Sequence, residues 1–141
     1  MDISYEQAQT PMVAESLLEV LVPQRQAVVV GLSGDLGAGK TTLVQSIART
    51  LGVTEHVVSP TFVVAKFYPV TTVQFDRLVH IDAYRIESVQ ELAALGWKTL
   101  IDTPRTLIII EWPEHIKEAL PENTQSFCIE HLGDMRRITS Q

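Results

Sequence analysis

The stretch from residue 27 to residue 52 constrains the fold most, because an apolar run leads through a glycine-rich loop into a helical pattern. The run AVVVGLSG at residues 27–34 has the continuous apolar character of a strand that is buried on both faces. After Lys40, apolar residues recur at helical spacing as far as Leu51, and Gly52 provides a C-terminal stop. Strand, glycine loop and helix in this order predict a layered α/β domain.

The glycine loop, GDLGAGKT, satisfies the pattern G-x-x-x-x-G-K-[ST] with Gly34, Gly39, Lys40 and Thr41. Glycines let backbone N–H groups surround phosphate oxygens at the positive end of the following helix. In such a loop, called a P-loop, the lysine reaches the outer phosphates and the hydroxyl can coordinate Mg²⁺. The alternative is an ordinary glycine turn, but the buried strand before the loop and the helix after it favour phosphate binding.

The rest of the chain continues the alternation of strands and helices. Thr10 and Pro11 have the character of an N-cap and a first helical residue, which predicts a helix that stops near Pro23. A capping box at residues 88–91 predicts a short helix that Gly96 ends. Further strands are predicted at residues 61–68 and 77–82 as an adjacent pair, at 106–113 as a second buried strand, and at 126–132 and 135–139 as a closing hairpin.

These elements predict one fold class for the whole chain. We expect a single-domain α/β P-loop NTPase over residues 1–141, with a mostly parallel central sheet, antiparallel additions and helices on both faces. The length of 141 residues suits one domain, and 45% hydrophobic with 20% charged residues is ordinary for a globular protein.

The composition also indicates where the protein is located and whether it contacts a membrane or nucleic acid. Its longest apolar runs are far shorter than the roughly 20 residues that span a bilayer, and the first ten residues lack the features of a secretory signal. We therefore expect a cytoplasmic protein without membrane contact, and the single cysteine, Cys128, fits a reducing compartment. The net charge of −6 disfavours non-specific binding to nucleic acid, so any nucleic acid is expected to be held by a partner.

Two acidic residues end predicted strands and are candidates for the active site. Asp82 ends the predicted strand LVHID. Glu111 follows four apolar residues in LIIIE, which predicts a carboxylate beside the P-loop, so Glu111 fits the role of helping to hold Mg²⁺ better than Asp82 does. The alternative for each is an acidic side chain that faces water. Thr61 in SPTF lies where a switch segment can contact the γ-phosphate or Mg²⁺, although a Ser-Pro turn explains the stretch equally well.

Four further side chains have both a functional and a structural interpretation. His80 and Asp82 point to the same face of a strand, as an acid–base pair would, but a hydrogen-bonded histidine near the sheet surface fits as well. Trp112 would lie over the mouth of the site or pack at its rim. Arg85 and Arg137 are the nearest candidates for charge stabilisation, or ordinary surface arginines.

The motifs GDLGAGKTT, SPTF, HIDAYR and EWPE, in this order and with these gaps, resemble the TsaE (YjeE) family over most of the chain. The resemblance implies a cytoplasmic ATPase with weak Mg²⁺-dependent activity alone. It implies a place in the bacterial system that forms threonylcarbamoyladenosine next to the anticodon of tRNAs reading codons that begin with A. It also implies two partners, a carbamoyltransferase subunit and its non-catalytic homologue, through which the protein meets tRNA indirectly.

The resemblance implies roles for individual residues as well. Thr41 and Glu111 would hold Mg²⁺, and Asp82 would be a second active-site acid that also contacts the nucleotide. With Thr61 of the switch-like stretch, Glu111 and Asp82 make up the expected catalytic set. The segment around Gly133 and Arg137 and the segment at residues 7–10 would lie near the base and ribose. The expected phosphate-binding residues are Gly34, Gly37, Ala38, Gly39, Lys40, Thr41 and Thr42.

Two other functions stay open on the sequence. A small-molecule phosphotransferase would need a lid with several arginines and an acceptor pocket, for which 141 residues with 11 Lys and Arg leave little chain. A nucleotide-dependent binding switch would use ATP and ADP only to select partner surfaces. Asp82, Glu111 and Thr61 favour hydrolysis over such a switch.

Overall fold

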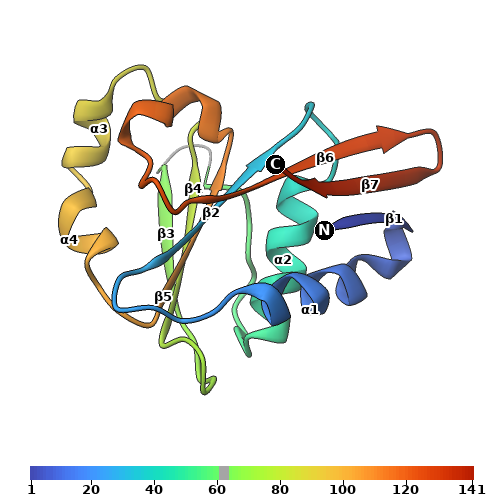
Figure 1. Cartoon of the computed structure of the whole chain (residues 1–141), viewed down its shortest axis with the longest axis horizontal. Helices are drawn as coiled ribbons and strands as arrows, with labels where there is room; N and C mark the ends of the chain where they lie inside the picture. Colours follow the sequence, from blue (N-terminus) through green and yellow to red (C-terminus); the bar gives the residue numbers. More distant parts are fainter. Residues whose placement is uncertain (61–63) are drawn as a thin grey trace.

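The computed structural model describes residues 1–60 and 64–141, whose strands form one seven-stranded sheet (Figure 1). None of the helices in these described residues is long and apolar enough to cross a membrane. The strands are β1 (Asp2–Glu6), β2 (Val28–Ser33), β3 (Ala65–Pro69), β4 (Arg77–Asp82), β5 (Thr106–Glu111), β6 (Gln125–Leu132) and β7 (Met135–Ser140). The helices are α1 (Thr10–Val20), α2 (Lys40–Thr50), α3 (Val89–Ala93) and α4 (Trp97–Ile101), with 3₁₀ helices η1 (Gln7–Gln9) and η2 (Pro113–Ala119).

Within the described residues, the strand order in the sheet is β1-β7-β6-β2-β5-β4-β3. The central strands β6, β2, β5 and β4 pair in parallel. At one edge β7 pairs antiparallel with β6 and β1 with β7, and at the other edge β3 pairs antiparallel with β4. This topology confirms the mostly parallel sheet with antiparallel additions, and with it the adjacent pair β3 and β4 and the closing hairpin.

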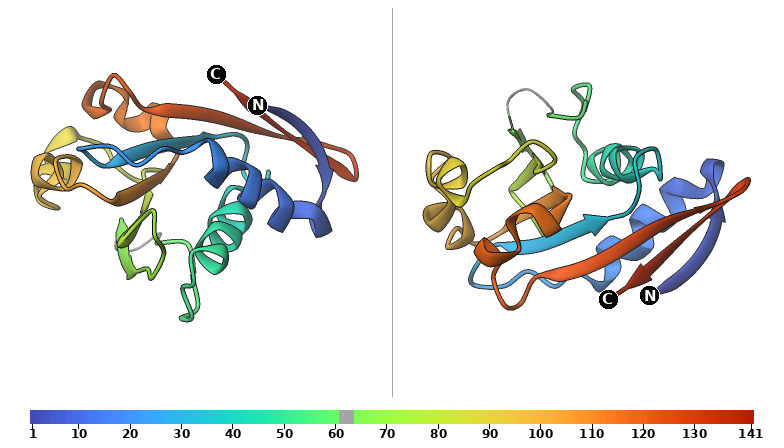
Figure 2. Two further views of the ribbon diagram at one scale, coloured as in Figure 1. Left: turned by 60° about the horizontal axis from the view of Figure 1, so that its bottom comes forward. Right: turned by 90° about the horizontal axis from the view of Figure 1, so that it is seen from above.

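Helices cover both faces of the sheet, as predicted. Side chains alternate along the buried strands, so that Val28 and Val30 of β2 join an apolar cluster with α1 and α2, whereas Val29 joins a second cluster with Trp97 and Leu100 of α4. Figure 1 shows α1 and α2 to one side of the strands and α3 and α4 to the other, and Figure 2 shows this arrangement from two further directions. Each large side chain buried in these clusters stabilises the fold by about 1.5–3 kcal/mol.

The strand register brings the acidic strand ends to the P-loop. Leu32, one residue before the end of β2, and Asp82 at the end of β4 both pair with Glu111 at the end of β5. Parallel strands carry their carboxyl ends to the same edge of the sheet, and α2 begins at Lys40 after the loop that follows β2. The predicted phosphate loop and both predicted acids therefore meet at one edge.

Three segments differ from the prediction: the N-terminal residues, the predicted short helix before Gly96, and the start of the strand predicted at 61–68. Residues 2–6 form edge strand β1, which was not predicted because only Tyr5 in it is buried and its partner β7 lies at the other end of the chain. The predicted short helix, α3, ends at Ala93 and not at Gly96, whose left-handed φ of 71° instead leads into a second helix, α4. The strand predicted at 61–68 begins at Ala65 and runs to Pro69, because Val64 before it is a bend with a φ of 65°, and residues 61–63 lie outside the described residues.

Candidate nucleotide-binding site

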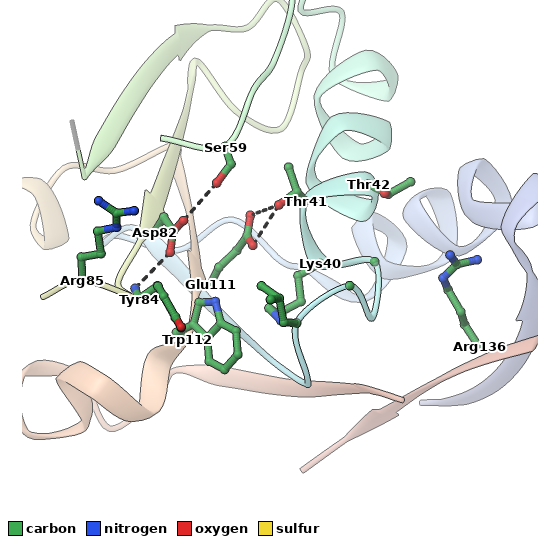
Figure 3. A pocket seen from close by; sticks show the side chains of 13 residues that line it. Lys40, Thr41, Thr42, Ser59, Asp82, Tyr84, Arg85, Glu111, Trp112 and Arg136 are labelled. Carbon is green, nitrogen blue, oxygen red and sulfur yellow. Dashed lines mark hydrogen bonds between the residues drawn. The ribbon is translucent and has the colours of Figure 1, made fainter. Parts of the chain in front are cut away.

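A pocket opens at the carboxyl edge of the central strands, where the P-loop leads into α2 (Figure 3). Ligands of open α/β sheets bind at this edge. The pocket gathers residues that the sequence singled out from three separate segments. Its lining includes Gly37, Gly39, Lys40, Thr41, Asp82 and Glu111.

Two glycines of the P-loop combine a positive φ with a close approach to the β6–β7 hairpin. Gly34 has a φ of 136°, and a Cβ added to it would lie far inside van der Waals contact with the Ile129 carbonyl oxygen of β6. Gly39 has a φ of 109°, and its added Cβ would lie 2.9 Å from Nε of Arg136 in β7. L side chains rarely adopt these backbone conformations. The close approach to the β6 backbone therefore excludes a side chain at Gly34, whereas at Gly39, where the neighbouring atoms belong to the flexible Arg136 side chain, the backbone conformation favours glycine.

The Lys40 ammonium is buried against its own loop. The residue is 4% exposed, and its Nζ donates to the carbonyl oxygens of Gly34 at 2.5 Å and Asp35 at 2.8 Å. Burial lowers the pKa of Lys40, and the negative charge of Glu111 partly offsets this effect. A desolvated ammonium inside a loop of backbone N–H groups is suited to an anionic phosphate chain.

Thr41 and Glu111 point toward each other from the start of α2 and the end of β5 (Figure 3). The Thr41 hydroxyl lies 2.9 Å from one carboxylate oxygen of Glu111 and 3.0 Å from the other, and Glu111 is 3% exposed. Hydroxyl and carboxylate oxygens are the ligands that Mg²⁺ prefers, and Mg²⁺ typically takes its remaining ligands from phosphates and water. The pair therefore fits a magnesium ion shared with a nucleotide. In the described residues, no group of three His, Cys, Asp or Glu side chains forms a separate metal site.

Asp82 lies beside this pair with both of its oxygens engaged. The Ser59 hydroxyl donates to one oxygen at 3.0 Å, and the backbone N–H of Tyr84 donates to the other at 3.0 Å. Ser59 thereby fixes the start of the SPTF stretch to the end of β4 (Figure 3). Thr61, the predicted switch residue, lies outside the described residues. The contact between Ser59 and Asp82 joins two segments far apart in the chain, and no local sequence pattern predicts it.

Trp112 lines the pocket, in agreement with the first of its two predicted positions. Its φ of 60° places it in the left-handed region, and its ring centroid lies 4.0 Å from Nζ of Lys40. The Tyr84 and His115 rings flank it, with centroid separations of 5.0 Å and 5.9 Å. An aromatic face near a desolvated ammonium is a favourable cation–π contact. The indole thus covers the side of the P-loop that carries Lys40.

His80 does not pair with Asp82, its neighbour on the same strand face. It is fully buried, and its Nε2 lies 2.7 Å from a carboxylate oxygen of Glu111 on the adjacent strand. Both sequence interpretations of His80 are therefore incomplete, because the partner comes from β5, and the register of two strands is not visible in a single sequence.

The arginine at the far end of the pocket is Arg136 and not the predicted Arg137. Arg136 donates from Nε to the Ala38 carbonyl at 3.2 Å and from Nη2 to Gln7 at 3.1 Å, and it lines the pocket. Arg137 points to the other face of β7 and forms an ion pair of 2.6 Å with Asp2. The predicted segments at residues 7–10 and in β7 do approach the P-loop, but through Gln7 and Arg136.

Of four other predicted residues, two line the pocket and two do not. Thr42 lines the pocket but points away from Glu111, and Arg85 lines the pocket at the end opposite Arg136 (Figure 3). Ala38 is buried in the loop. Gly133 forms the exposed turn of the β6–β7 hairpin with a φ of 66° and is not part of the lining, so the structure does not bring it to the pocket.

Comparisons with known proteins agree with this geometry. The sequence model of the family described as threonylcarbamoyl adenosine biosynthesis protein TsaE matches residues 4–139. The tRNA threonylcarbamoyladenosine biosynthesis protein TsaE of Haemophilus influenzae is 34% identical over 125 residues, which cover 89% of this chain and 75% of that protein. The protein of the same name from Streptomyces coelicolor is 40% identical over 108 residues, or 75% of this chain and 71% of that protein.

A solved structure extends the likeness to three dimensions. The crystal structure of YdiB from Bacillus subtilis superimposes with a TM-score of 0.75 at 29% sequence identity and covers 99% of this chain and 84% of that one. The family match spans nearly every element of the sheet, including the P-loop, both acidic strand ends and the hairpin. The chain therefore belongs to the TsaE family.

Proposed function

We propose that this protein is a weak Mg²⁺-dependent ATPase that acts in the formation of threonylcarbamoyladenosine on tRNA. The observation that carries the proposal is the meeting of Lys40, Thr41 and Glu111 in one pocket at the carboxyl edge of the sheet. Membership of the TsaE family supports a role in this process, because the relatives are named as tRNA threonylcarbamoyladenosine biosynthesis proteins.

Each of the three residues has a proposed role. The P-loop backbone and Lys40 bind the outer phosphates of ATP, and the buried position of the ammonium strengthens its attraction to them. Thr41 and Glu111 supply oxygen ligands for Mg²⁺. When bound, Mg²⁺ neutralises charge that develops on the phosphates during hydrolysis.

Asp82 is the proposed group that orients the attacking water. Hydrogen bonds from Ser59 and from the Tyr84 backbone fix both of its oxygens, so the carboxylate has little freedom to rotate. Fixed acceptors of this kind are useful where a water molecule must be aligned with a phosphate. Thr61 is proposed to act with it as the switch residue of the SPTF stretch.

The proposal includes two partners, a carbamoyltransferase subunit and its non-catalytic homologue. Apolar side chains at the rim of the pocket support an interaction there, since Leu36 is 83% exposed and Tyr84 is 48% exposed. A partner that covers this rim would exclude water from the site and raise the rate of hydrolysis. ATP would then be hydrolysed mainly in the assembled complex, in the cytoplasm.

A reconstitution tests the whole proposal. The two partners, tRNA and the substrates of the modification are combined with wild-type protein, with Lys40→Ala, or with Lys98→Ala, whose lysine is exposed on α4 outside the pocket. We propose that hydrolysis resets the complex between rounds of modification. We therefore expect several rounds of threonylcarbamoyladenosine formation with wild type and Lys98→Ala, and at most one round with Lys40→Ala. Equal modification with all three proteins, or without any of them, would contradict the proposal.

The same samples distinguish the proposed ATPase from the two other functions, a small-molecule phosphotransferase and a nucleotide-dependent binding switch. ATP-dependent phosphorylation of a metabolite by the protein alone would indicate a phosphotransferase. Full modification supported by a non-hydrolysable ATP analogue would indicate a binding switch without catalysis.

A further inference from the structure

His80 is a fully buried polar side chain to which the proposed function assigns no role. The ring comes from β4, is 0% exposed, and places Nε2 at 2.7 Å from Oε1 of Glu111. On the other side, the Thr41 hydroxyl lies within 3.0 Å of both oxygens of the same carboxylate. The Glu111 carboxylate is therefore held between β4 and α2.

The register explains how His80 reaches this carboxylate. β4 and β5 are parallel, and His80 pairs with Ile109, two residues before Glu111. Residues two apart on a strand face the same side of the sheet, so His80 and Glu111 are diagonal neighbours on one face. Because β4 and β5 are central strands with helices on both faces, the relative position of the two side chains is set by the sheet itself.

A role in stability alone does not account for a histidine at this position. Its Nδ1 has no hydrogen-bond partner among the described residues. An unpaired polar atom in a dry interior is destabilising, and an apolar side chain of the same size would avoid that cost. Within the part of the chain that the structure describes, the one hydrogen bond of the buried ring is to the proposed Mg²⁺ ligand, which points to an effect on that ligand.

We infer that His80 is a positioning residue for Glu111. It donates its Nε2–H to Oε1, fixes the rotamer of the carboxylate, and keeps the carboxylate directed at Thr41 and the metal position. This inference rests on the proposed function, since it assigns a task to a residue behind the Mg²⁺ site. Hydrogen-bonded partners of metal-binding side chains orient them, and removing such a partner typically costs about 10–100-fold in metal affinity or activity.

A matched pair of variants isolates the donated hydrogen bond. Gln and Met have nearly the same length and volume, but only Gln carries an N–H group that can replace Nε2–H. The primary measurement is the Mg²⁺ concentration that gives half-maximal binding of a non-hydrolysable ATP analogue, followed by titration calorimetry. The melting temperature and kcat for phosphate release are recorded for the same samples, and His56→Met, at an exposed loop position outside the pocket, is the control.

We expect His80→Met to raise the half-maximal Mg²⁺ concentration by about 10–100-fold and His80→Gln to raise it by no more than roughly threefold. Binding of the analogue without Mg²⁺ is expected to stay the same in both variants. Equal Mg²⁺ dependence of His80→Met and His80→Gln, with wild type behaving normally, would overturn the inference and leave the proposed function intact. Wild-type protein that binds the analogue with no Mg²⁺ dependence would instead overturn the proposed function, and the inference with it.

A measurement on the unmutated protein covers the case in which a variant does not fold. Nitrogen-15 NMR of the histidine rings distinguishes the two neutral tautomers. We expect the His80 ring to carry its proton on Nε2, and a proton on Nδ1 alone would overturn the inference.

Discussion

Replacing Gly34 by alanine tests the claim that the P-loop is shaped by its contact with the β6–β7 hairpin. The added Cβ would lie less than 3.0 Å from the Ile129 carbonyl oxygen, which is backbone and cannot rotate away. A carbon–oxygen contact needs about 3.3 Å, so the loop or β6 has to move. Next to this point, Ser33 of β2 pairs with Cys128 of β6, and that pairing would be strained by the movement.

The size of the effect has two parts. The φ of 136° at Gly34 costs about 1–3 kcal/mol with a side chain present, and forcing an extra methyl group into a packed region costs about 1–3 kcal/mol more. We therefore expect the free energy of unfolding to fall by roughly 2–6 kcal/mol, a large share of the about 5–15 kcal/mol that typical domains have.

Gly133→Ala is the matched control for this experiment. Gly133 also has a positive φ, of 66°, but a Cβ added there meets nothing within 4 Å, so only the backbone cost of about 1–2 kcal/mol applies. Urea denaturation followed by circular dichroism measures both variants. A loss for Gly34→Ala no larger than that for Gly133→Ala would refute the reasoning, because the contact with Ile129 would then have no energetic effect.

The remaining predictions concern the two ends of the pocket and the N-terminal strand. Thr41→Ala is expected to raise the Mg²⁺ requirement for hydrolysis by about 10–100-fold, whereas Thr41→Ser, which keeps the hydroxyl, stays close to wild type in a Mg²⁺ titration. Arg136→Ala removes the hydrogen bonds to Ala38 and Gln7 and is expected to weaken nucleotide binding, measured by calorimetry, by about fivefold or more. Arg137→Ala is expected to leave the affinity unchanged. The reverse result would favour the sequence prediction that Arg137 lies near the nucleotide. The hydrogen bond from Arg137 lowers the pKa of Asp2 from its ordinary value of 3.8. A carboxyl whose pKa is lower in the folded state stabilises the folded protein at pH values above its unfolded pKa, and this stabilisation is lost as the pH falls through the folded pKa. In urea titrations, the difference in free energy of unfolding between wild type and Asp2→Asn should therefore be present at neutral pH and disappear as the pH falls below about 3.8.

The parts of the site that could be predicted are those in which the signal is local. Gly34, Gly39 and Lys40 lie within seven positions of one another and follow a buried strand, so spacing and context together identify a phosphate loop. Glu111 could be found because four apolar residues before it mark a strand, and the ends of parallel strands share one edge of the sheet.

The parts that could not be predicted depend on which strands become neighbours. Arg136 and Arg137 are adjacent, and only the pairing of β7 with β1 decides which of them faces Asp2 and which faces the P-loop. His80 was compared with Asp82 on its own strand, but its partner Glu111 is set by the register of β4 with β5. Contacts between distant segments are fixed by packing of the whole sheet, and a single sequence does not show them.

The most direct test of the central claim is phosphate release from ATP by wild-type protein and by Glu111→Gln. The Gln variant keeps the size of the side chain and removes the negative charge opposite Thr41. Both proteins are measured with Mg²⁺, alone and after addition of the two partners and tRNA. We predict slow release by wild type alone, faster release in the presence of the partners, and a rate lower by about 10²-fold for Glu111→Gln in both cases. Equal rates for the two proteins, or rapid release by wild type that the partners do not change, would contradict the account.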